Sequence, residues 1–203
     1  MAKELIITAD DFGLGSGVNR AVADAFAANT LSSASLMTIA PGFEEAVNIT
    51  QDLPGLDIGL HFVLAWGKPI SPASEIPSLL DRSGGFLPRH QLFVRGATGR
   101  LQRSDVAREL EAQLSRLHDA NIKPSFINGD QHVHILPIVR DVVVEAASRY
   151  GLAVRIPTEQ RIWRFGGARF IDWPKAIGRL LVKSTIGILN RGFAYRCRNM
   201  NIS

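Results

Sequence analysis

Residues 5–13 read LIITADDFG, an apolar run followed directly by two adjacent carboxylates. The run at 5–9 predicts a buried strand, so Asp10 and Asp11 are expected where that strand ends. Like charges side by side are costly unless a cation or a catalytic task uses them, although a single Asp also favours turns and helix N-caps. Because adjacent strand residues point in opposite directions, we expect one acid to bind a metal and the other to handle a proton.

Strand and helix patterns alternate along the rest of the chain. Apolar runs predict further strands at 34–39, 57–64, 125–128 and 152–156, and helical spacing predicts helices at 17–28, at 43–50, after a cap at Ser104, and from Pro137. This alternation is typical of an α/β fold with mostly parallel strands and right-handed crossovers. We therefore expect one β/α domain over 1–203. Residues 65–100, rich in Pro and Gly, should form an irregular insertion on the substrate side.

Polar residues recur where the predicted strands end, which is the edge that carries the active site in such folds. Besides the two acids, the residues at this edge are His61, Asp130, His132, His134 and Arg155. Imidazole and carboxylate together suit a divalent metal. A single His could instead cap a helix, bond a carbonyl or lie in the core. The convergence of four segments on one edge favours metal binding or catalysis.

Composition excludes several other classes of function. No window of about 18 apolar residues is present, so no membrane span is expected. The N-terminus lacks the features of a signal peptide and Cys197 has no partner cysteine, which together predict a cytoplasmic protein. Residues 161–203 carry a net charge of +8, but no nucleic-acid motif accompanies this basic segment. No Gly-x-Ser-x-Gly elbow is present, which argues against a serine nucleophile.

Three separated motifs resemble those of the YdjC-like carbohydrate deacetylases, over roughly residues 5–157. The first comprises TADDFGL at 8–14, GVN at 17–19 and LSSASLM at 31–37. The second is GLHFVL at 59–64 with GKP at 67–69, and the third is NGDQHVH at 128–134 with Pro137. The family includes chitooligosaccharide deacetylases and a branch tied to hopanoid biosynthesis.

This resemblance implies an irregular β/α barrel and a divalent metal that activates water to hydrolyse the N-acetyl group of an amino sugar. It makes Asp10 the general base, and Asp11 and His61 metal ligands. A protonated His132 or His134 would donate a proton to the leaving amine. We also assign Phe12 and Arg155 to substrate binding.

The chain departs from the family pattern in two places. The family usually has a His where this chain has Asp130, the position of the third ligand. Asp130 could serve as an oxygen ligand, which would favour Mg²⁺ or Mn²⁺ over Zn²⁺, or His132 could take its place. Members of the family also carry a late His-Pro motif, whereas this chain has no histidine after His134. The five strands counted by residue 157 leave open an incomplete barrel, because a full one takes about 250 residues.

The leading hypothesis is thus a metal-dependent deacetylase of a chitooligosaccharide-like or lipid-linked N-acetylglucosamine substrate, with acetate as a product. The rivals are a metal-dependent esterase or phosphoesterase using the same edge, and a degenerate family member that binds sugar or metal without turnover. Exposed edges of a shortened barrel would favour a homodimer.

Overall fold

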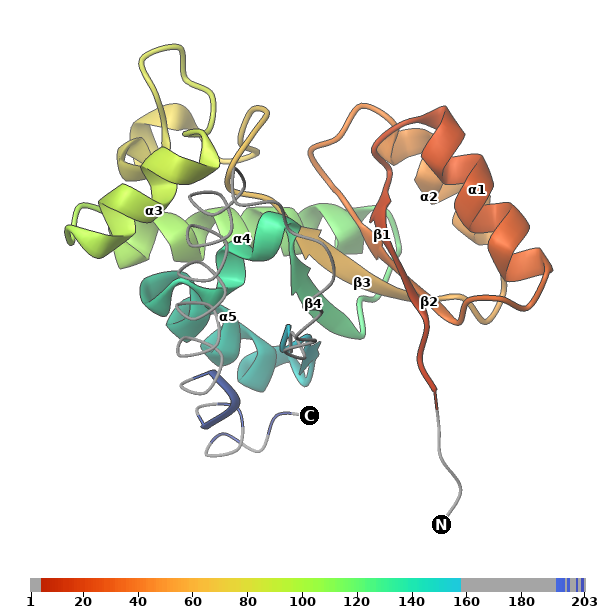
Figure 1. Ribbon diagram of the computed structural model, residues 1–203. Helices are drawn as coiled ribbons and strands as arrows, with labels where there is room; N and C mark the ends of the chain where they lie inside the picture. The colour runs from red at the N-terminus through yellow and green to blue at the C-terminus, as the bar shows by residue number, and fades with distance from the viewer. Residues whose placement is uncertain (1–4, 158–192, 196, 198–199, 201, 203) are drawn as a thin grey trace, which may run out of the picture.

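The computed structural model of the chain describes residues 5–157, 193–195, 197, 200 and 202. Strands and helices alternate through the described part (Figure 1). The elements are β1 (Thr8–Phe12), α1 (Ser16–Ala27), β2 (Ser33–Leu36), α2 (Phe43–Gln51), β3 (Asp57–Phe62), α3 (Arg89–Ala97), α4 (Arg103–Asp119), β4 (Phe126–Gly129), α5 (Pro137–Tyr150) and β5 (Ala153–Val154), with short 3-10 turns at Ala73–Glu75, Pro77–Leu79 and Asp130–Ile135.

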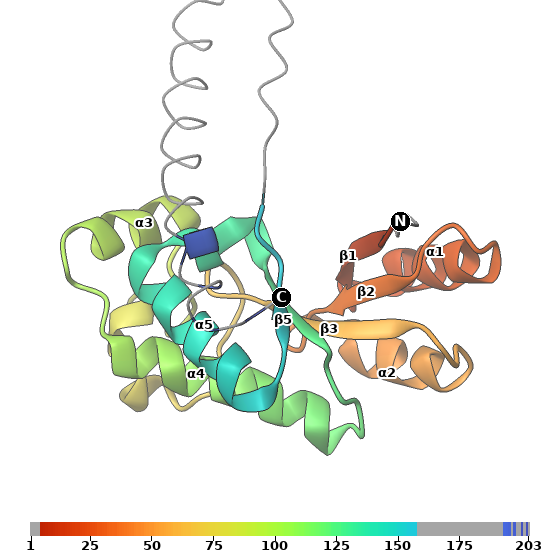
Figure 2. The ribbon, with the colours of Figure 1, turned by 90° about the horizontal axis from the view of Figure 1, so that it is seen from below.

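The five strands form one parallel sheet in the order β1-β2-β3-β4-β5. The predicted α/β class with parallel strands is therefore confirmed. In a sheet whose order follows the sequence, every right-handed crossover places its helix on the same face, as in β/α barrels. Accordingly α1 packs on α2 and α4 packs on α5, and the helices follow one another around the sheet (Figure 2). Within the described residues, β1 and β5 are the two edges of this sheet.

The two faces of the sheet differ in chemistry because strand side chains alternate. One face is apolar and contributes Ala34, Leu36, Ile58, Leu60, Phe62 and Ile127 to the main core beneath the helices. The other face carries the polar side chains of Ser35, His61 and Asn128, of which His61 and Asn128 pair directly across β3 and β4. Both sets of side chains are buried, and the polar ones gather on the face opposite the apolar core.

Most predicted elements are confirmed, but three details are wrong. The first strand is Thr8–Phe12 rather than 5–9, and the apolar side chains of residues 5–7 are exposed beyond the point where β1 joins the sheet. Residues 65–100 are not wholly irregular, because α3 forms there with Leu92 as its buried residue. Ser104 is not a helix cap, since α4 begins at Arg103 and the Ser104 hydroxyl bonds Asp105.

Two further expectations concern the chain as a whole. The basic segment 161–203 lies outside the described residues except for the few near its end. No helix in the described ranges is long and apolar enough to cross a membrane.

The loop after β1 is fixed by close packing on the turn before α2. Asn19 of α1 accepts a hydrogen bond from the Gly13 N–H at 2.8 Å and donates one to the Gly42 carbonyl at 3.0 Å. Gly42 itself has no room for a side chain, because a Cβ there would lie 2.8 Å from the Gly13 oxygen and from the Gly15 Cα. Backbone contacts of this kind hold the end of β1, and with it the acid pair, in place.

We predict that Gly42→Ala lowers the free energy of unfolding by about 1–3 kcal/mol, the usual cost of overpacking. Gly17→Ala is the matched control, because nothing lies within 4 Å of its Cβ position in α1. Alanine in a helix should leave stability unchanged or raise it by up to about 1 kcal/mol. Urea unfolding of both variants checks this, and equal stability of the two would contradict the packing argument.

Candidate metal centre

Three polar side chains from separate strands meet at the carboxyl edge of the sheet. Asp11 lies near the end of β1, His61 in β3, and Asp130 directly after β4. The His61 Nε2 lies 3.2 Å from the Asp11 Oδ1 and 4.0 Å from the Asp130 Oδ1. One ligand atom from each residue falls within 4.8 Å of the others, a spacing at which one ion could contact all three.

A β-bulge places Asp11 in this cluster. Ala9 pairs with Ala34 but Phe12 pairs with Leu36, so β1 has one extra residue between the two pairs. Asp11 has a φ of 63°, the left-handed region that Asp tolerates better than most residues. The bulge allows two adjacent carboxylates to reach different partners at the same edge.

Burial and charge oppose each other within the cluster. Burial lowers the pKa of His61, while Asp10, Asp130 and Asp11 act to raise it. Burial raises the pKa of Asp130, and the nearby His61 opposes that shift. Among the described residues, no lysine or arginine lies within 4.0 Å of Asp11 or Asp130. One imidazole whose neutral form is favoured by burial, with two carboxylates that no lysine or arginine of the described residues pairs with, is a donor set that fits a divalent cation.

Asp10 belongs to a different set of contacts. Its Oδ1 accepts hydrogen bonds from the Ser35 hydroxyl at 3.0 Å and from the Asn128 amide at 2.8 Å. The Arg155 guanidinium donates to both oxygens, at 2.9 Å to Oδ1 and 2.8 Å to Oδ2. Contacts from β2, from β4 and from the residue after β5 therefore hold Asp10 in one orientation. Asp10 lies beside the triad formed by Asp11, His61 and Asp130 and is not part of it. Its Oδ2 has the fewer partners of the two oxygens.

The turn after β4 orients the two remaining histidines differently. Gln131 and His132 have φ values of 48° and 58°, which reverses the chain sharply after Asp130. His134 is fully buried and its Nε2 lies 3.0 Å from the Arg155 carbonyl, to which a protonated Nε2 donates. Its ring packs on Gly129, where a Cβ would lie only 2.1 Å from the His134 Nδ1. His134 thus supports the backbone of the residue that holds Asp10.

The structure brings most of the predicted site residues together. Asp10, Asp11, His61, Asp130 and Arg155 share the edge as expected, and His132 is half-buried on the adjoining turn, 6.1 Å from the His134 ring.

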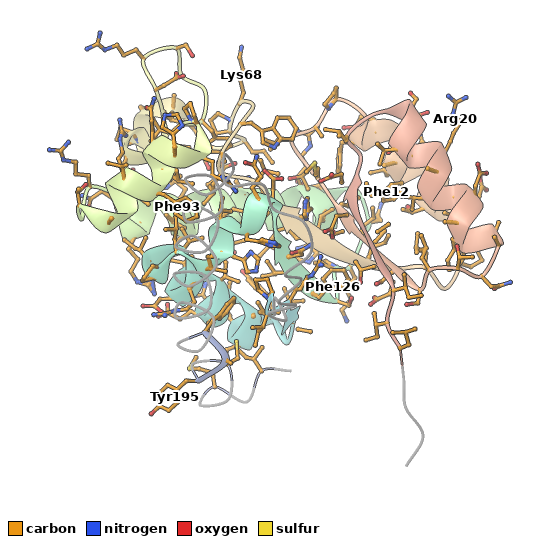
Figure 3. All side chains as sticks on the ribbon, viewed as in Figure 1. Phe12, Arg20, Lys68, Phe93, Phe126 and Tyr195 are labelled. Atoms are coloured by element: carbon orange, nitrogen blue, oxygen red, sulfur yellow. The ribbon has the colours of Figure 1, made fainter. Side chains whose placement is uncertain are left out.

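The substrate-binding assignment of Phe12 requires correction. Phe12 is fully buried in the main core, on the side of β1 that faces α1 (Figure 3). The bulge after Ala9 reverses the alternation and turns this ring inward, which the sequence does not indicate.

Sequence reasoning missed four residues that contact the acids, one of which is Gln131, whose amide donates to the Asp130 Oδ2 at 3.2 Å. Ser35 and Asn128 bond Asp10, and the Trp66 indole Nε1 donates to the Asp130 Oδ2 at 2.9 Å. Register could have indicated Ser35 and Asn128, because both lie on the polar face of predicted strands. Trp66 comes from the irregular segment after β3, and no periodic signal there predicts where it points.

The chain is similar to several known proteins. A family model described as YdjC-like protein matches residues 4–199. A carbohydrate deacetylase of Geobacillus stearothermophilus is 39% identical over 76% of this chain and 60% of its own length. A chitooligosaccharide deacetylase of Enterobacter sp. (strain 638) is 36% identical over 77% of this chain and 60% of its own length.

A solved structure from Enterococcus faecalis V583, named for cellobiose-phosphate cleavage, superposes with a TM-score of 0.69 and 27% identity. The superposed region covers 77% of this chain and 59% of the Enterococcus faecalis chain. The chain therefore spans about 60% of the length of the curated relatives it matches.

We predict a distinct acid sensitivity from His134. Burial lowers the pKa of this residue from 6.5 to about 4. Between these values the unfolded chain binds the proton and the folded chain does not, so stability is full above about pH 6.5 and falls as the pH approaches 4. The loss attributable to His134 should reach about 3 kcal/mol.

His134→Gln removes this titrating group while keeping an amide that can hydrogen-bond. The wild type should therefore lose more stability than the variant between pH 7 and pH 4. Urea unfolding of both proteins in chelator across this range measures the difference, and parallel pH profiles would contradict the assignment.

Proposed function

Because this chain belongs to the YdjC-like family, we propose that it is a metal-dependent hydrolase that removes the N-acetyl group from an amino sugar and releases acetate. The observation that carries the proposal is the separation of two adjacent acids. Asp11 lies with His61 and Asp130 in a triad suited to a cation, while Asp10 is held beside them by other partners. The names of the deacetylase relatives supply the reaction and the substrate class.

The proposed ligands of the cation are Asp11, His61 and Asp130. The chemistry supplied at such a site by a divalent cation is Lewis-acid chemistry, which makes a water easier to deprotonate and polarises the amide carbonyl. Two carboxylates and one imidazole favour Mg²⁺ or Mn²⁺, with Zn²⁺ as the softer alternative. The Trp66 bond to the Asp130 Oδ2 leaves the other oxygen of Asp130 directed at His61, which supports Asp130 over His132 as the third ligand.

Asp10 is the proposed general base. Three donors orient its carboxylate, and the Oδ2, which accepts from Arg155 alone among them, is the proposed acceptor of a proton from the attacking water. Arg155 orients this base, which is a different role from the substrate contact expected from sequence. The leaving amine needs a proton, and His132 is the proposed donor of the two histidines. It is half-buried, whereas His134 is fully buried with its Nε2 at the Arg155 carbonyl.

The proposed substrate is a chitooligosaccharide-like N-acetylated sugar, and lipid-linked N-acetylglucosamine is the second form to assay. A metal-dependent esterase or phosphoesterase acting at the same edge is a rival. The Enterococcus faecalis structure is named for cellobiose-phosphate cleavage, a name that does not say which bond is cleaved. A sugar-binding or metal-binding protein without turnover is the remaining rival. The cytoplasmic location and the homodimer stay predictions, and the mass of the protein in solution tests the latter.

We predict that the protein loaded with Mg²⁺ or Mn²⁺ releases acetate from N-acetylated chitooligosaccharides. Asp10→Asn should lower turnover by about 10²–10⁴-fold, the usual contribution of a general base, while metal affinity stays nearly intact. Asp11→Asn should lose both metal and turnover. Acetate assays and metal titrations of the three proteins measure both properties.

Equal metal loss in the two variants would contradict the division of roles. Phosphate release from sugar phosphates without acetate would support the phosphoesterase. Sugar binding without either product would support the non-catalytic rival.

A second prediction concerns the metal preference. Asp130→His exchanges a carboxylate for an imidazole, so the ratio of Zn²⁺ to Mn²⁺ affinity should rise by about tenfold or more. Asp57→His makes the same exchange at the exposed start of β3, remote from the carboxyl edge, and should leave the ratio unchanged. Competition titrations with a chelating dye measure the ratio, and a ratio unaffected by Asp130→His would exclude Asp130 as a ligand.

A further inference from the structure

Three buried polar side chains form a stripe along α4 that the reaction does not use directly. Asp105, Glu109 and Gln113 are spaced four residues apart, so they lie on one face of the helix, and each is at most 5% exposed. Among the described residues, no basic side chain forms an ion pair with either acid. Buried polar groups are costly unless they are hydrogen-bonded, so their partners indicate what the stripe does.

Every member of the stripe binds backbone of the irregular segment that follows β3. The Ser78 N–H donates to Asp105 at 2.9 Å, and the N–H groups of Ile70 and Ser71 donate to the two oxygens of Glu109 at 3.1 and 3.0 Å. Gln113 accepts from the Val63 N–H at 3.1 Å and donates to the Val63 carbonyl at 2.8 Å. The stripe thus fixes the segment at successive points where no strand supports it.

Along the chain, Trp66 lies between Val63, which bonds Gln113, and residues 70–71, which bond Glu109. Its ring packs beside a small apolar cluster of Met37, Ala40 and Val63, apart from the main core. Its Nε1 donates to the Asp130 Oδ2 at 2.9 Å. The Gln131 amide donates to the same oxygen at 3.2 Å, so the two bonds together leave the Oδ1 of Asp130 for the triad.

Val63, which Gln113 bonds, is also close in sequence to His61, one of the proposed metal ligands. It follows His61 by two residues, at the point where β3 has ended. Gln113 therefore holds the chain between a proposed ligand and the tryptophan that orients another proposed ligand. Groups that orient a ligand in this way typically change metal affinity by about 10–100-fold when they are removed.

We propose that Trp66 is a positioning residue for the metal centre and that Gln113 of α4 holds Trp66 in place. The proposal rests on the proposed function, because it requires a cation at Asp11, His61 and Asp130. It extends the site to a helix whose side chains do not contact the cation. It also explains why the polar Gln113 is buried in α4, where an apolar side chain would pack at lower cost.

The test measures Mn²⁺ affinity from the signal of free Mn²⁺ in electron paramagnetic resonance, together with thermal unfolding of the metal-free proteins. Trp66→Phe keeps an aromatic ring but removes the N–H. Gln113→Met keeps the length of the side chain but removes both bonds to Val63 and the bond to Glu109 at 2.9 Å. Asp105→Ala is the matched control, because it removes a bond of the same stripe at Ser78, away from Trp66.

The wild type should bind one Mn²⁺, and Trp66→Phe and Gln113→Met should each weaken binding by about 10–100-fold at a temperature where all are folded. Asp105→Ala should lose thermal stability yet keep its affinity within about threefold, the scatter expected for remote contacts. A purely structural role for Trp66 would lower thermal stability without this loss of affinity.

The possible failures are distinguishable. A wild type that binds none of Mn²⁺, Mg²⁺ and Zn²⁺ would overturn the metal centre and the proposed function with it. A wild type that binds Mn²⁺, with Trp66→Phe binding equally well, would overturn only the role of Trp66. Weak binding by Trp66→Phe with normal binding by Gln113→Met would overturn the role of the helix.

Discussion

The bulge in β1 is the constraint on which the rest of the site depends. A regular strand would point Asp10 and Asp11 to opposite faces of the sheet, and one of them would enter the apolar core. The extra residue and the left-handed conformation of Asp11 keep both carboxylates at the carboxyl edge. A non-glycine residue in this conformation costs roughly 1–2 kcal/mol, so surrounding contacts must maintain it. The packing of Gly13 and Gly15 on Gly42, with Asn19 bonded to both sides, supplies such contacts.

The two acids then differ in how their charge is balanced. Arg155 forms an ion pair with Asp10, and neutral donors on β2 and β4 complete its hydrogen bonds. Asp11 and Asp130 have His61 between them, and burial favours the neutral form of that imidazole. The first arrangement suits a fixed base, and the second leaves negative charge that a divalent cation would neutralise. The remaining histidine of the third motif, His134, contributes through the backbone of Arg155.

The sequence predicted the parts of this arrangement that depend on periodicity. Apolar runs and helical spacing placed the parallel sheet, and the strand ends placed Asp10, Asp11, His61, Asp130 and Arg155 at one edge. Phe12 was assigned wrongly because a bulge reverses alternation without any signature in residue type. The partners of Arg155 could not be predicted, since they depend on side chains more than a hundred residues away in the chain. Trp66 and the stripe on α4 were missed for a related reason. Trp66 lies in an irregular segment, and the partners of the stripe are backbone groups of that segment, whose path no pattern specifies.

The central claim is that Asp11, His61 and Asp130 hold a cation while Asp10 stays outside it. An anomalous-scattering map from crystals grown with Mn²⁺ tests this most directly. The account predicts one strong peak in contact with one oxygen of each of Asp11 and Asp130 and with the His61 Nε2, and with Asp10 still paired to Arg155. A peak bound by Asp10, or by His132 in place of Asp130, would contradict it.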